Sequence, residues 1–227
     1  MSNNQNHMKK NQNKEIKIFA YGFDAAGFET PQEPIKLNNI CIIEFIGLND
    51  TLRLDGADGV ITLQGIFEKI KTPRPLTIGR YTTIDVNKEL LLEREKQVFN
   101  LLEKDKWICF LVGKIVDSFY SGFARSSLKI VDDTDLCKKL LNTYNVERNT
   151  VDGISLLNAT ENEFISYVRE YGIAQTVLNL PSERYNESNV IVKAGNHIVG
   201  VEFLNKVFFL PFHTTKKQID DVIPIVK

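Results

Sequence analysis

Hydrophobic residues along this chain fall into short, almost unbroken runs, and each of the first four is followed within a few residues by a glycine. The first four runs with strand character are Ile16 to Tyr21, Ile40 to Ile46, Gly59 to Leu63 and Trp107 to Val112. Short apolar runs that are rich in β-branched and aromatic residues and end in turn residues are typical of buried strands. The pattern therefore predicts four buried β-strands.

A helical pattern separates the third run from the fourth. The segment Val86 to Lys104 is rich in Leu, Glu and Lys, Asp85 is placed to cap its start, and Leu91, Val98 and Leu101 recur at helical spacing. A strand, a helix and a second strand in this order form a βαβ unit, in which the two strands run parallel. We therefore expect a parallel sheet.

The C-terminal part has a different pattern. Three strand-like runs, Asn189 to Ala194, Ile198 to Leu204 and Val207 to Phe212, are separated by only two or three residues. Connections this short join neighbouring strands as hairpins, so these runs are expected to pair antiparallel.

Three more helices are expected. The first covers Asp133 to Tyr144. The second begins at Thr160, where Thr160 and Glu163 have the spacing of a capping box, and ends near Gly172. The third runs from Thr215 to Pro224. Together the elements predict an α/β fold of the Rossmann or flavodoxin-like type, with three layers, a mostly parallel central sheet and antiparallel C-terminal strands.

Composition sets the limits of the domain and its partners. The chain has 227 residues, and residues 1–14 are so polar that we expect a disordered tail before a single α/β domain at 15–227. The formal net charge is −1, so no overall basic field gathers nucleic acid, and only Lys69 to Arg80 is locally basic. We expect a small-molecule or protein partner rather than nucleic acid, and oligomers remain open.

Neither a secretion signal nor a membrane-spanning stretch is visible in the sequence, so we expect a cytoplasmic protein. The three cysteines lack CxxC spacing and are expected to be reduced. The histidines His7, His197 and His213 are too far apart for metal-ligand spacing, and Tyr21 to Gly27 lacks the glycine spacing of a nucleotide-binding loop. We therefore expect neither a metal nor a cofactor.

Candidate binding residues follow from the parallel sheet. Ligands of open α/β sheets bind outside the carboxyl ends of the strands, where the loops diverge. This rule selects the residues that follow the first, third, fourth and last of the strands: Phe23, Asp24, Gln64, Gly65, Lys114 and His213.

The segment Ala57 to Gly65, followed by a helix and then by Trp107 to Gly113, resembles class I glutamine amidotransferase-like domains. The family includes the trehalose-utilisation type, in which catalytic residues are often missing. The resemblance implies a nucleophilic Cys at a sharp elbow after the second of these strands. It also implies a His-Pro-Glu sequence after the final strand, where this chain reads Phe212-His213-Thr214-Thr215.

The departures from the family pattern concern its catalytic residues. At the elbow the chain has Gly113 and Lys114, Cys109 lies inside the preceding strand, and the family's Glu is absent beside His213. We therefore expect a non-catalytic, amidotransferase-like module that binds a ligand or partner as a component of a larger assembly. The alternative is a hydrolase or transferase that acts on a small anionic substrate through Asp24, Lys114 and His213.

Overall fold

The computed structural model describes residues 15–23, 31–36, 41–47, 54–63, 72–75, 82–85, 88–112, 119–121, 124–126, 136–156, 159–161, 165–166, 173–181, 189–211 and 225–226. The expected tail at 1–14 and the expected helix from Thr215 to Pro224 lie outside these ranges.

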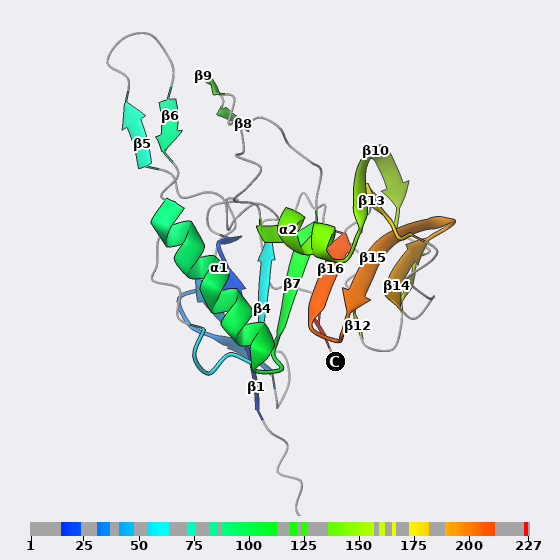
Figure 1. Ribbon diagram of the computed structural model, residues 1–227, viewed down its shortest axis with the longest axis horizontal. Coiled ribbons are helices and arrows are strands. Elements are labelled where there is room, and N and C mark those ends of the chain that lie inside the picture. The colour runs from blue at the N-terminus through cyan, green and yellow to red at the C-terminus, as the bar shows by residue number, and fades with distance from the viewer. Residues whose placement is uncertain are drawn as a thin grey trace, which may run out of the picture.

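A block of parallel strands forms the centre of a mixed sheet (Figure 1). Its five strands, in spatial order, are β3 (Cys41–Ile46), β1 (Ile16–Tyr21), β4 (Gly59–Leu63), β7 (Trp107–Val112) and β16 (Val207–Pro211). All four contacts between neighbours in this block are parallel. The four predicted apolar runs are thereby confirmed as central strands, and β16, from the C-terminal group of runs, is the fifth.

Antiparallel strands complete both sides of this sheet. Beyond β16 lie β15 (His197–Phe203), β14 (Val190–Ala194) and the short β11 (Thr160–Glu161), each antiparallel to its neighbour. On the other side the short β2 (Ile35–Lys36) pairs antiparallel with β3. The predicted antiparallel pairing of the C-terminal strands is confirmed.

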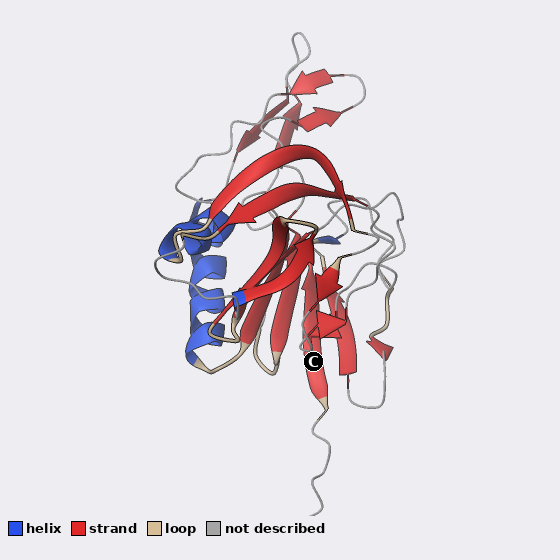
Figure 2. Cartoon of the chain, turned by 90° about the vertical axis from the view of Figure 1, so that its right-hand side faces the viewer, coloured by secondary structure: helices blue, strands red, loops and turns tan. Residues whose placement is uncertain are grey.

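Two helices are present in the described part of the chain, α1 (Lys88–Glu103) and α2 (Leu136–Thr143), and both cover the same face of the sheet (Figure 2). The βαβ unit is confirmed, because α1 connects the adjacent parallel strands β4 and β7. Val98 and Leu101 of α1 are buried, as the helical spacing predicts. Neither helix is long and apolar enough to cross a membrane.

The prediction of a helix that begins at Thr160 is wrong. Thr160 and Glu161 form β11, and Ile165 with Ser166 forms β12 (Ile165–Ser166), which pairs with β17 (Ile225–Val226). A capping box stabilises only the first turn of a helix, by a small free energy. Here pairing of this segment with the edge of β14 supplies backbone hydrogen bonds instead, so tertiary context outweighs the local signal.

Three further strand pairs were not expected from the sequence. The longest joins β10 (Glu147–Ser155) to β13 (Ile173–Asn179), and β13 packs against β15. The other two join β5 (Thr72–Pro75) to β6 (Thr82–Asp85) and β8 (Phe119–Ser121) to β9 (Ala124–Ser126). The basic segment around Arg74 therefore includes a strand.

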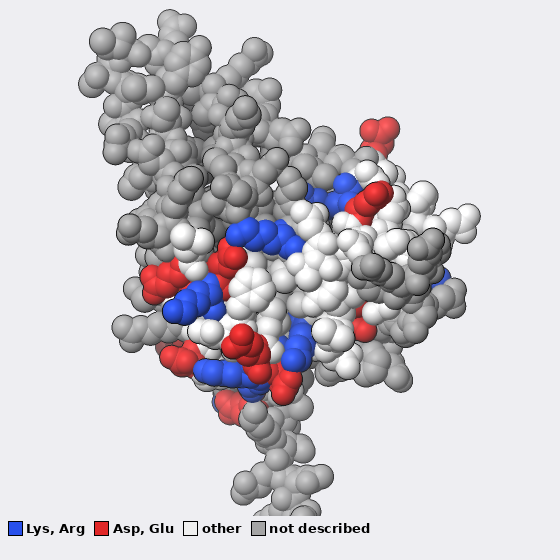
Figure 3. Space-filling model, viewed as in Figure 1, with Lys and Arg blue, Asp and Glu red and all other residues white. Residues whose placement is uncertain are grey.

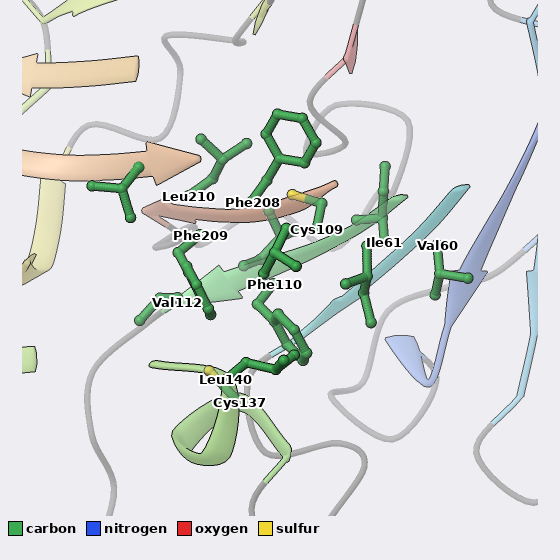
Figure 4. Packing of buried hydrophobic residues seen from close by; sticks show 14 of the residues in the cluster. Val60, Ile61, Cys109, Phe110, Val112, Cys137, Leu140, Phe208, Phe209 and Leu210 are labelled. Atoms are coloured by element: carbon green, nitrogen blue, oxygen red, sulfur yellow. The ribbon is translucent and has the colours of Figure 1, made fainter. Parts of the chain in front are cut away.

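The central strands are buried on both faces. Figure 4 shows Phe110 of β7 directed toward Cys137 and Leu140 of α2, whereas Cys109 lies on the other side of the strand beside Phe208. The rings of Phe110 and Phe209 stack with their centroids 5.6 Å apart. Successive residues of a strand point to opposite faces, and both Cys109 and Phe110 are buried. Both faces of the strand are therefore covered, which explains why polar residues do not alternate with apolar ones in these runs.

Asp58 joins the starts of three central strands. The backbone N–H of Lys17 donates to its Oδ2 at 3.0 Å, and the Lys106 ammonium donates to its Oδ1. Its own N–H donates to the Lys17 carbonyl at 2.7 Å, and its carbonyl accepts from the N–H of Trp107 at 3.4 Å. One residue thus connects β1, β4 and β7 at their amino ends.

Replacing this carboxylate should destabilise the sheet. In Asp58→Ala the Lys17 N–H and the Lys106 ammonium lose their acceptor, which should lower the free energy of unfolding by about 1–3 kcal/mol in denaturant titrations. Asp55→Ala is the matched control, because the Asp55 side chain in the same loop is 96% exposed; its effect should stay within about 0.5 kcal/mol. Equal effects of the two substitutions would contradict this role of Asp58.

Gly59 is required by the packing of Trp107. A Cβ at residue 59 would overlap the indole ring of Trp107, which lies directly across from it on β7. Gly59→Ala should therefore lower the free energy of unfolding by about 1–3 kcal/mol. In a Trp107→Leu background the same substitution should cost measurably less, and a double-mutant cycle with no coupling would refute this steric explanation.

Candidate functional site

The carboxyl ends of the parallel strands lie at one edge of the sheet. Tyr21 of β1 is level with Thr62 of β4, Thr62 with Phe110 of β7, and Val112 of β7 with Pro211 of β16. The chain therefore leaves these strands at a common edge, which we call the carboxyl edge. The candidate binding residues were chosen on the expectation that the parallel strands end together at one edge, and they do.

One of the six predicted binding residues is described. Phe23 follows β1 and is only 1% exposed, so its ring packs in the core beneath the carboxyl edge. Gly22, at φ 75°, turns the chain here, and its N–H donates to the Ile46 carbonyl at 2.8 Å. The other five stay predictions because they lie outside the described residues: Asp24, Gln64, Gly65, Lys114 and His213.

Buried polar groups meet at the carboxyl edge beside Phe23. Within the described residues three polar or charged side chains are buried, and two of them, Thr62 and Arg94, contact Tyr21. The Thr62 hydroxyl donates to the Tyr21 carbonyl at 3.3 Å, and the Arg94 guanidinium lies 5.0 Å from the centre of the Tyr21 ring. Cations are attracted to the face of an aromatic ring at this distance.

Arg94 places a positive charge beneath the edge. Burial lowers the pKa of Arg94, while the neighbouring Tyr21 and Glu93 act in the opposite direction. The ordinary pKa of arginine is so high that the guanidinium stays protonated at neutral pH. A charge held in a low-dielectric interior acts more strongly on its surroundings than the same charge in water. The edge above Arg94 is therefore suited to an anionic group.

Arg94 is not among the residues predicted for the site, although the sequence carries a signal for it. Arg94 stands between Leu91 and Val98, at the spacing that places it on the apolar stripe of the helix. A charged residue on the inward face is unusual because burying a charge is costly. Because Arg94 is surrounded in the sequence by Glu and Lys residues, it resembles one more residue of the solvent-exposed face of the helix.

Cys109 has none of the properties of a nucleophile. It lies in the middle of β7, its side chain is 0% exposed, and burial raises its pKa well above the usual value of a thiol. The thiolate is the reactive form, so a buried neutral thiol is inert. This confirms the expectation that Cys109 is buried within its strand. Cys137 is also a buried free thiol.

A cavity lined by described residues lies at the opposite edge, where the parallel strands begin. It has a volume of about 600 Å³ and lies between the loop at residues 54–58 and the last two turns of α1. None of the predicted binding residues is among those that line it. In the same part of the chain, no cluster of three or more His, Cys, Asp or Glu residues is placed to hold a metal ion.

Comparison with protein-family models, with curated proteins and with solved structures found no match to this chain.

The state of Cys109 can be tested by alkylation. In the folded protein, iodoacetamide should leave Cys109 unlabelled in peptide mass spectra, and denaturation should expose it. An ordinary thiol becomes reactive as the pH approaches about 8.5; because the pKa of Cys109 is raised, its labelling should stay absent there. The control Asn196→Cys, in an exposed turn, should label at once. Labelling of Cys109 in the folded protein at a comparable rate would contradict the buried thiol.

Proposed function

We propose that this chain is a non-catalytic, amidotransferase-like module that binds a small anionic ligand at the carboxyl edge of its sheet. The observation that carries the proposal is the position of Cys109. The cysteine nearest the expected elbow is held inside β7 and is 0% exposed, so it cannot reach a substrate. A module that keeps the strand arrangement without a nucleophile is suited to binding rather than to amide transfer.

The strand order supports the finer assignment of the fold. Numbered along the chain, the five parallel strands lie in the order 2-1-3-4-5, which is that of flavodoxin-like doubly wound sheets. Both faces of the central strands are buried, and the two described helices cover one of them. In these sheets ligands bind where the strand order reverses, which in this chain is the boundary between β1 and β4.

Arg94 supports the anionic character of the ligand. Its guanidinium lies over Tyr21, the last residue of β1, and Tyr21 is level with Thr62 of β4. The buried charge is therefore located at the boundary at which the strand order reverses. A positive charge in the interior is little screened, so its field favours an anionic group such as phosphate or carboxylate at this boundary.

The alternative, an enzyme that uses Asp24, Lys114 and His213, is favoured by one observation. These residues follow β1, β7 and β16, and the carboxyl ends of β7 and β16 are adjacent in the sheet. The alternative predicts turnover of an anionic substrate that is lost in His213→Ala.

The proposal is tested by calorimetric titration of the full chain with inorganic phosphate. Arg94→Leu should weaken phosphate binding measurably, because it removes a buried positive charge that is 1% exposed and acts on the edge through the low-dielectric interior rather than by direct contact. Its free energy of unfolding should be unchanged or higher, since apolar replacement of a buried charge is often neutral or stabilising. Lys96→Leu is the control, because it removes the same charge from an exposed position of α1.

Three results would overturn the proposal. The first is a phosphate affinity that is the same in Arg94→Leu and in the unchanged protein, or no phosphate binding at all. The second is hydrolysis of glutamine that is lost in Cys109→Ser. The third is phosphate-ester hydrolysis that is lost in His213→Ala, which would establish the enzyme in place of the binding module.

A further inference from the structure

The cavity at the amino ends of the strands has the size of a ligand site. Its volume of about 600 Å³ is within the roughly 300–1,000 Å³ typical of pockets for small molecules. One wall is the inward side of α1 near its end, the other is the loop before β4, and the floor is formed where β1 and β7 begin. The described lining residues are Glu15, Lys17, Leu54, Asp55, Gly56, Ala57, Asp58, Gln97, Asn100, Leu101, Lys104 and Lys106.

The charges around this cavity are balanced. Three acidic and three basic residues line it, and the two at its floor, Asp58 and Lys106, form an ion pair with each other. The ammonium of Lys17 is 2.6 Å from Glu44 outside the cavity. Figure 3 shows acidic and basic side chains interspersed over the described part of this face. A site without a net field favours a ligand without net charge.

Gln97 contributes a hydrogen-bond acceptor to which a ligand could donate. Its Oε1 is buried and has no hydrogen-bond partner among the described residues. A buried acceptor without a donor is costly, so such groups are rare in folded proteins and call for an explanation. Asn100 lies three residues along α1 and lines the same cavity, so two carboxamides face it from neighbouring positions of one helix. Carboxamides both donate and accept hydrogen bonds.

The remaining residues that line the cavity restrict the class of ligand that it can bind. The apolar contribution comes from Leu54, Ala57 and Leu101, and the described lining contains no aromatic residue on which a nucleobase could stack. At the rim, Lys104 and Asp55 are 68% and 96% exposed and lie 4.0 Å apart. They are available to a carboxylate and an ammonium of one ligand, because an exposed ion pair of this length is weak.

We propose that this cavity is a second binding site, and that its ligand is a small amide with no net charge, such as a zwitterionic dipeptide. Gln97 Oε1 accepts a hydrogen bond from the ligand N–H, and Asn100 pairs with the ligand carbonyl. Lys104 and Asp55 face the ligand's carboxylate and ammonium. The site is separate from the carboxyl edge and does not depend on the function proposed for that edge.

The probes are diglycine, which carries both charges, and N-acetylglycinamide, which carries neither. Titration of the full isotopically labelled chain should show saturable shifts of the side-chain amide signals of Gln97 and Asn100 in NMR spectra. Gln97→Leu should weaken binding of both probes about tenfold or more, and its melting temperature should equal or exceed that of the unchanged protein. Asn142→Leu, which removes an exposed carboxamide from α2, should change affinity less than about twofold.

Asn100 provides a second variant if Gln97→Leu fails to fold. Asn100 is exposed, so Asn100→Leu should fold and should weaken both probes. The site is refuted if neither probe binds the folded protein saturably. It is refuted equally if Asn142→Leu weakens the probes as much as Gln97→Leu or Asn100→Leu does. Diglycine binding that is tighter than that of N-acetylglycinamide and is lost in Lys104→Ala would support the roles of the rim charges.

Discussion

The carboxylate and backbone of Asp58 fix the register of the central sheet. Through hydrogen bonds to Lys17, Trp107 and Lys106, this residue aligns the starts of β1, β4 and β7. The strands are regular and buried, so alignment at their starts also aligns their ends, where Tyr21 is level with Thr62. Both edges that we consider functional, the one above Arg94 and the one that contains the cavity, therefore depend on the same group of hydrogen bonds.

The parts of this fold that could be predicted are those with a local cause. Apolar runs identified the central strands, four of them followed by a glycine, and the spacing of Val98 and Leu101 identified α1, because burial imposes these patterns directly on the sequence. The strand β10 could not be found in this way. The segment Glu147–Ser155 is largely polar, and it is a strand through its pairing with β13. The prediction of a helix at Thr160 failed for a related reason, because a capping signal is weaker than pairing with a neighbouring strand.

The candidate sites were predictable to a smaller extent. The strand-end rule led to the carboxyl edge and to Phe23, but a single residue on a helix, such as Arg94, is not part of that rule. The cavity at the other edge combines a loop, two strand starts and the end of α1, which are distant in the sequence and share no motif. Gln97 is distinguished by its three-dimensional surroundings alone, in which its buried Oε1 has no partner among the described residues. On α1, Arg94 and Gln97 thus bring two costly polar groups to one side of the sheet within a single helical turn.

The packing of Trp107 has a practical consequence for work on this protein. It is the single tryptophan of the chain, it lies across from Gly59 on the neighbouring strand, and its ring meets Phe208 edge-on at a centroid distance of 6.1 Å. Indole emission shifts in wavelength when the ring passes from an apolar surrounding to water. The natural fluorescence of the unmodified protein therefore monitors the integrity of its central sheet, without an added label.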